Sequence, residues 1–91
     1  MIRDVRKVKQ NLLKKGFIRE QGAKHTHYIF VYKGNEICRT YMSRNDQDIN
    51  DYLIESMGKQ VHLDKRDFIK LIDCPLSEKG YIKILKEKDL L

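Results

Sequence analysis

Two runs rich in β-branched and aromatic residues, 25–32 and 37–43, are separated by the four residues Lys33-Gly34-Asn35-Glu36. Such runs favour β-strands, and a glycine at the first central position of a two-residue connection is typical of a type II′ turn. We therefore expect a β-hairpin with Gly34 and Asn35 at its tip. This hairpin constrains the fold strongly, because its turn fixes which residues of the two strands face each other.

The turn also sets the two faces of the expected hairpin. Its register pairs Lys33 with Glu36, Tyr32 with Ile37, Tyr28 with Tyr41, His27 with Met42 and His25 with Arg44. One face then holds Tyr28, Phe30, Tyr32, Ile37 and Tyr41. The other face holds His25, His27, Ile29, Val31, Cys38 and Met42. Both faces are partly apolar, so the sequence leaves open which of them the helices cover.

Helices are expected on both sides of this hairpin in the chain. Apolar residues at helical spacing predict a helix over 4–15, with Asp4 at its N-terminal end and Gly16 after it. A short strand over 17–20 and a turn over 21–24 lead into the hairpin. Three further amphipathic stripes follow the polar segment 44–48, so the expected order is helix, three strands, three helices.

Each of the three later helices has a candidate N-cap and a stripe of apolar residues. For the first helix, the candidate N-caps are Asp46 and Asp48, and the apolar stripe is Ile49, Leu53 and Met57. This helix is expected to end near Gly58 or as late as Val61. For the second, the cap is Asp64, the stripe is Phe68, Leu71 and Ile72, and the terminator is Pro75. For the third, the cap is Ser77 and the stripe is Tyr81, Ile82 and Leu85.

The chain is expected to be one α+β domain over residues 1–91, with a three-stranded antiparallel sheet and helices on one face. A domain of about 60 residues is marginal, and two more amphipathic helices add apolar area. We therefore expect residues 61–91 to pack on the rest of the chain through Phe68, Leu71, Ile72, Ile82 and Leu85.

Positive charge is concentrated in the first half of the chain. Residues 1–44 hold 11 Lys and Arg against 3 Asp and Glu, and residues 45–91 hold 8 against 10, so the net charges are +8 and −2. A ridge on the outer side of the first helix would consist of Arg6, Lys7, Lys9, Lys14 and Lys15. This distribution suits a polyanion, although a solvated cationic face without a partner has the same composition.

The sequence contains no sign of a membrane or secretory segment. No apolar run approaches the roughly 20 residues that span a bilayer, and residues 1–4 lack the apolar stretch of a secretory signal. We therefore expect a cytoplasmic protein without a membrane partner. Its two cysteines, Cys38 and Cys74, are far apart, and we expect both to be reduced and buried.

Two segments, residues 12–17 and 22–30, together resemble the HicA family of toxin ribonucleases. Leu12-Leu13-Lys14-Lys15-Gly16-Phe17 is similar to the family's L-x-x-x-G-F segment, and residues 22–30 resemble its glycine, small spacer and histidine at the start of an aromatic strand. The resemblance covers about residues 4–60 and leaves 61–91 as a helical extension. It implies an α-β-β-β-α core related to double-stranded RNA-binding domains. It also implies cleavage of messenger RNA without a metal or other cofactor, and inhibition by a HicB antitoxin.

Two histidines compete for the catalytic position that this resemblance implies. The spacing from Gly22 to His25 is similar to a longer form of the motif, and Thr26-His27 is similar to a shorter form. We favour His25. Residues two apart in a strand share a face, so both histidines are expected on the same side of the sheet.

Histidine is suited to this reaction on general grounds. RNA is cut by its own 2′-hydroxyl once a base removes that proton, and the unperturbed pKa of a histidine side chain, about 6.5, allows this near neutral pH. Lys24 beside His25 and Arg44 opposite it would stabilise the negative charge of the phosphorane. The remaining expected RNA contacts are Lys7, Lys14, Lys15, Arg19 and Tyr28.

The sequence gives weaker support to two other kinds of site, a metal site and a surface on which bases stack. A metal ion could bind His25, His27 and Cys38. The sequence offers no fourth ligand at a recognisable spacing from these three residues, so we expect no metal site. Bases could stack on an aromatic row formed by Tyr28, Phe30, Tyr32 and Tyr41, but a buried aromatic core is the commoner role.

Three functions are therefore consistent with the sequence. The first is a HicA-like endoribonuclease that uses a strand histidine for general acid/base catalysis. The second is a non-catalytic RNA-binding module of the same fold, which would hold RNA by shape and phosphate contacts. The third is a protein interaction module whose basic surface meets an acidic partner.

The charge of the first half generates a prediction about salt. If the surface neutralises six to ten phosphates, the affinity for a generic RNA should fall by roughly 10³–10⁵-fold between about 50 and 200 mM salt, because bound counterions are released. Filter binding or fluorescence anisotropy across that range measures the slope. An affinity that stays constant between low and physiological salt would argue against polyanion binding.

Overall fold

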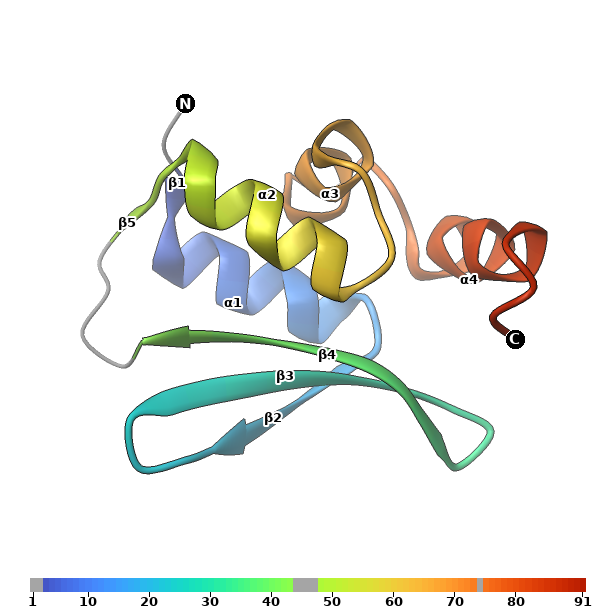
Figure 1. The fold of residues 1–91 in the computed structure, drawn as a ribbon, viewed down its shortest axis with the longest axis horizontal. Helices are drawn as coiled ribbons and strands as arrows, with labels where there is room; N and C mark the ends of the chain where they lie inside the picture. The colour runs from blue at the N-terminus through green and yellow to red at the C-terminus, as the bar shows by residue number, and fades with distance from the viewer. Residues whose placement is uncertain (1–2, 44–47, 74) are drawn as a thin grey trace.

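A computed structural model describes residues 3–43, 48–73 and 75–91 (Figure 1). The elements in chain order are β1 (Arg3–Asp4), α1 (Val5–Lys14), β2 (Phe17–Gln21), β3 (His25–Tyr32), β4 (Asn35–Ser43), β5 (Asp48–Ile49), α2 (Asp51–Gln60), α3 (Lys65–Ile72) and α4 (Glu78–Glu87). Within the described part of the chain, no helix has the length and apolarity needed to cross a bilayer.

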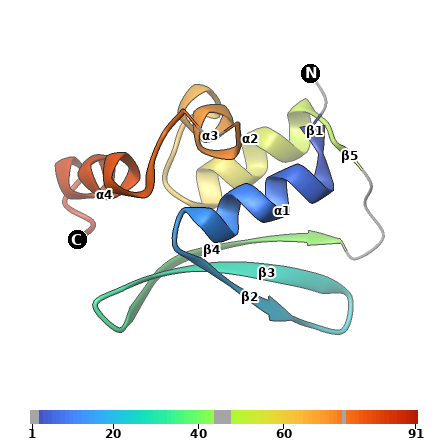
Figure 2. The same cartoon turned by 180° about the vertical axis from the view of Figure 1, so that it is seen from behind.

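Strands β2, β3 and β4 form a three-stranded antiparallel sheet in that order. Helices α1, α2 and α3 lie over one face of this sheet, and α4 lies beyond α3 toward the β3–β4 turn (Figures 1 and 2). The expected α+β fold is therefore confirmed. Neither view shows a described helix on the opposite face of the sheet, which we call the open face.

Side-chain caps fix where three of the helices begin. The first backbone N–H groups of a helix lack partners within it, and a side-chain oxygen just before the helix can accept from one of them. Asp4, Asp64 and Ser77 do so for α1, α3 and α4, as expected.

Helix α2 begins later than the sequence suggests. Its cap is Asn50, whose Oδ1 accepts a hydrogen bond from the Leu53 N–H at 2.9 Å. The expected cap Asp48 lies instead in β5, which pairs with β1, and Asp46 lies outside the described residues. Nothing in the composition of two such short strands signals their pairing, and this pairing delays the helix.

The turn between β3 and β4 lies one residue earlier than expected. Tyr32 pairs with Asn35, so Lys33 and Gly34 form the turn, with φ values of 50° and 82°. Positive φ at both central residues is the geometry of a type I′ turn, whose twist matches that of the flanking strands. Glycine adopts this φ without a steric cost, so the expected type II′ turn over Gly34 and Asn35 is wrong.

A β-bulge between Phe30 and Val31 changes the register a second time. Val31 faces Glu36 and Phe30 faces Cys38, so β4 has one extra residue, Ile37, at this point. Beyond the bulge, the observed pairs are Tyr28 with Thr40, His27 with Tyr41, and His25 with Ser43.

This step of one residue exchanges the two faces of β4, because successive side chains of a strand point to opposite sides. Cys38 and Met42 join Tyr28 and Phe30 in the core, and Tyr41 moves to the open face. The expected faces are therefore wrong for Cys38, Tyr41 and Met42, whereas Ile37 packs against the core together with Tyr32, as expected.

One hydrophobic core joins the sheet to all four helices. Of the side chains expected to bury the C-terminal segment, Phe68, Leu71, Ile72 and Leu85 are buried, and Ile82 is only partly buried. Cys38 is buried as expected, and Cys74 lies outside the described residues.

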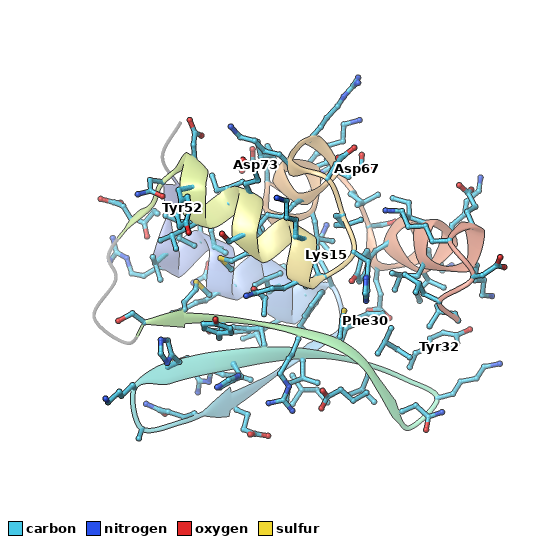
Figure 3. The ribbon with its side chains drawn as sticks, in the orientation of Figure 1. Lys15, Phe30, Tyr32, Tyr52, Asp67 and Asp73 are labelled. Carbon is cyan, nitrogen blue, oxygen red and sulfur yellow. The ribbon has the colours of Figure 1, made fainter. Side chains whose placement is uncertain are left out.

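Tyr81 attaches α4 to this core. Its ring centroid lies 4.8 Å from that of Phe30 and 5.7 Å from that of Phe17, and Figure 3 shows Phe30 on the side of the sheet toward α4. Its hydroxyl donates to the Val61 carbonyl at 2.8 Å, so the Cys38 thiol donates to the Tyr81 oxygen across 3.2 Å. Burial raises the pKa of both groups, which therefore stay protonated near neutral pH.

Replacing Tyr81 should test this attachment. Tyr81→Ala removes a fully buried ring and leaves the Val61 carbonyl without its donor, so the free energy of unfolding should fall by about 3–5 kcal/mol. The matched change Tyr52→Ala removes a tyrosine that is 76% exposed, and its effect should stay within about 0.5 kcal/mol. Urea denaturation of both variants provides the comparison, and equal losses would mean that α4 does not depend on Tyr81.

Candidate functional site

The two histidines of β3 project from the open face of the sheet. The intervening and following residues, Thr26 and Tyr28, point the other way and are buried beneath the helices. His25 is exposed and His27 is half-buried. Their expected position on a common face follows from the alternation of side chains along the strand.

Tyr41 lies against both histidines. The register places it directly opposite His27, with ring centroids 5.6 Å apart and an interplanar angle of 42°. The His25 ring meets it edge-on, at 5.0 Å and 78°. Tilted and edge-on contacts at such distances are favourable between aromatic rings. We call His25, His27 and Tyr41 the histidine–tyrosine cluster.

The two ring nitrogens of His27 have different surroundings. Its Nδ1 is buried and has no hydrogen-bond partner within the part of the chain that the structure describes. The other edge of the ring lies beside Gly22, where an added Cβ would be 3.7 Å from Cδ2 and 3.8 Å from Nε2. Because Nδ1 is buried, any proton exchange between His27 and a bound molecule would have to use Nε2.

Charged groups of both signs surround the cluster. Glu20 on β2 lies opposite His27, and Lys24 is exposed in the turn that precedes His25. Arg39, two residues before Tyr41, donates to the Glu36 carboxylate at 2.7 and 3.0 Å. These hydrogen bonds lower the pKa of Glu36, so its charge persists and offsets that of Arg39.

Two of the expected RNA contacts are buried and must be corrected. Tyr28 is fully buried, because the register turns it toward the helices, and burial raises the pKa of its hydroxyl. Lys15 is 5% exposed, and its Nζ donates to the Leu76 carbonyl (Figure 3). Neither side chain can reach RNA in this structure.

The other expected cations lie apart from the cluster. Lys7 and Lys14 are exposed, but α1 belongs to the helical layer on the far side of the sheet (Figure 1). Arg19 is exposed on β2 and pairs with Tyr28, so it also faces away from the open side. Arg44 lies outside the described residues. Of the expected cations that are described, Lys24 is therefore the one next to the histidines.

The structure separates the residues of the two weaker candidate sites. Cys38 is buried on the helical side, away from His25 and His27, so these three residues cannot share a metal ion. No group of three or more His, Cys, Asp or Glu side chains able to hold a metal occurs among the described residues. The aromatic row is divided between the two faces, because Tyr28 and Phe30 are core residues and Tyr41 is on the open face.

Comparisons of the sequence and structure with family models, with curated proteins and with solved structures gave no significant match.

The burial of Lys15 generates a prediction that separates it from its neighbour. Lys15→Met would leave the Leu76 carbonyl without this donor and should lower the free energy of unfolding by about 1–3 kcal/mol. Lys14→Met changes an exposed side chain and should stay within about 0.5 kcal/mol. Thermal and urea denaturation measure both changes. Equal stability of the two variants would show that Lys15 is a surface residue in solution.

Proposed function

We propose that this protein is a metal-independent endoribonuclease of the HicA kind, with the histidine–tyrosine cluster as its active site. The observation that carries the proposal is the pair of the exposed His25 and the half-buried His27, which lie together against Tyr41 on a face that no described helix covers. Imidazole is the side chain best suited to proton transfer near neutral pH.

The cluster supplies the groups that cleavage of RNA requires. A neutral imidazole accepts the proton of the 2′-hydroxyl, the 2′-oxygen attacks the adjacent phosphorus, and the 5′-oxygen leaves and takes up a proton from an acid or from water. Lys24 is placed to offset charge that develops on the phosphate oxygens. DNA lacks the 2′-hydroxyl, so the same site would leave DNA uncut.

A non-catalytic RNA-binding module is the second candidate, and one observation favours it. The exposed lysines Lys7 and Lys14 lie on the helical layer, on the opposite side of the sheet from the histidines. RNA held by phosphate contacts at these lysines would not need the open face. An antitoxin of the HicB kind remains an expectation of the sequence resemblance, and a location in the cytoplasm accords with an RNA substrate.

Replacing His25 should separate chemistry from binding. His25→Ala removes a proton-transfer group and leaves the lysines unchanged, so cleavage should fall by roughly 10²–10⁴-fold while RNA affinity changes little. The assay uses purified protein, a mixed-sequence single-stranded RNA and a chelator, with His62→Asn as the control histidine. His62 lies between α2 and α3 with φ of 65°, a conformation that asparagine tolerates.

The control variant also detects contaminating nucleases. If wild type, His25→Ala and His62→Asn cut RNA equally, the activity does not belong to this site. If none of them cuts RNA and all bind it with equal affinity, the binding module is the correct function.

A further inference from the structure

We propose that His25 and His27 act as a complementary pair, one as general base and the other as general acid, and that Tyr41 is the positioning residue for both. This inference rests on the proposed ribonuclease function and goes beyond it, because the sequence resemblance implies a single catalytic histidine. The observation behind it is that one tyrosine ring contacts both imidazoles.

The spacing of the two histidines suits a pair. Alternate residues of a strand point the same way and lie about 6.6 Å apart along it. A phosphodiester held between two imidazoles needs a hydrogen bond of about 3 Å at each end, one to the attacking oxygen and one to the leaving oxygen. Two histidines on alternate positions of β3 can therefore flank one phosphate.

The imidazole rings of His25 and His27 have different contacts, which supports different roles for them. His27 is held against Gly22 and Tyr41 with Nδ1 buried, so proton exchange with a substrate would have to use Nε2. His25 is more exposed and is held by the edge contact to Tyr41. A substrate phosphate over Tyr41 would thus meet a fixed nitrogen on one side and a second imidazole on the other.

The reaction balances with these two groups alone. The neutral imidazole takes the proton from the 2′-hydroxyl, a bond forms between the 2′-oxygen and phosphorus, and the bond from phosphorus to the 5′-oxygen breaks. The protonated imidazole gives its proton to the 5′-oxygen. The products are a 2′,3′-cyclic phosphate and a free 5′-hydroxyl, and proton exchange with water restores the pair.

The first test compares single and double variants on one substrate. A 5′-labelled, mixed-sequence single-stranded RNA is incubated with wild type, His25→Ala, His27→Ala and the double variant, and cyclic phosphate ends are measured. Each single change should reduce the rate by roughly 10²–10⁴-fold. The double variant should lose about as much as either single variant, because groups that act in one step are strongly non-additive.

Two outcomes of this test have different meanings. If wild type cleaves and one histidine variant keeps the wild-type rate, the pair is excluded while the ribonuclease function stands. If wild type does not cleave, the proposed function itself fails. Circular dichroism of each variant confirms that the fold is intact before its rate is interpreted.

The second test concerns Tyr41 as a positioning residue. Tyr41→Phe keeps the ring contacts and should stay within about threefold of the wild-type rate, whereas Tyr41→Ala should lose roughly 10–100-fold in kcat, with little change in KM. Tyr52→Ala, on an exposed tyrosine of α2, serves as the control. A Tyr41→Ala rate equal to that of Tyr41→Phe would exclude the positioning role.

The pH dependence distinguishes a pair from a merely structural effect. A base and an acid acting together give a bell-shaped rate profile, and each histidine variant should lose one limb of the bell. Besides each other, the two imidazoles are faced by these titratable or charged groups of the described residues: Glu20 on β2, Lys24 in the turn, and Arg39 and Tyr41 on β4. Glu20→Gln should therefore shift a limb without removing it, and loss of a limb in that variant would contradict the assignment.

Discussion

The β-bulge between Phe30 and Val31 decides which side chains of β4 enter the core and which form the site. The turn at Lys33 and Gly34 shifts each cross-strand pair of β3 and β4 by two residues from the expected register. A shift of two residues leaves every side chain on its expected face. The extra residue at the bulge shifts every β3–β4 pair beyond it by one residue. The side chains of β4 beyond the bulge therefore lie on the face opposite to the expected one. Without it, Tyr41 would point into the core, and the cluster with His25 and His27 would not exist.

The same exchange connects the sheet to the C-terminal helices. It brings Cys38 to the helical side, where its thiol meets Tyr81, and it brings Thr40 to Gln60 of α2, with a hydrogen bond of 2.7 Å. Two α1 side chains, Asn11 and Lys15, donate to carbonyl oxygens of Ile72 and Leu76. A small domain gains stability from such additions, since a chain of about 60 residues buries a limited fraction of its surface. The site and the extension thus depend on a common register.

Periodicity was sufficient to predict the four helices and their order relative to the three strands of the main sheet, but it did not predict the short strands β1 and β5. Asp4, Asp64 and Ser77 could be found because a capping side chain acts within its own turn. The shared face of His25 and His27 could likewise be predicted, because it follows from the alternation of side chains along a single strand. Tyr41 was placed on the wrong face, because neither glycine nor proline marks residues 30–32 and 36–38 as a bulge. The burial of Lys15 also escaped prediction, since its acceptor lies 61 residues away in the sequence.

The helical layer and the open face of the sheet differ in charge, so they would have different roles in the proposed reaction. Around the cluster, Glu20 and Glu36 offset Lys24 and Arg39, so the described part of the open face is close to neutral. A helix is about 10–12 Å across, and the screening length at physiological salt is about 8 Å. In the proposed reaction, the lysines of α1 would therefore attract RNA toward the molecule but would do little to offset the charge on a phosphate at Tyr41. Catalysis on the open face would then come mainly from proton transfer, which is the chemistry that two histidines can provide.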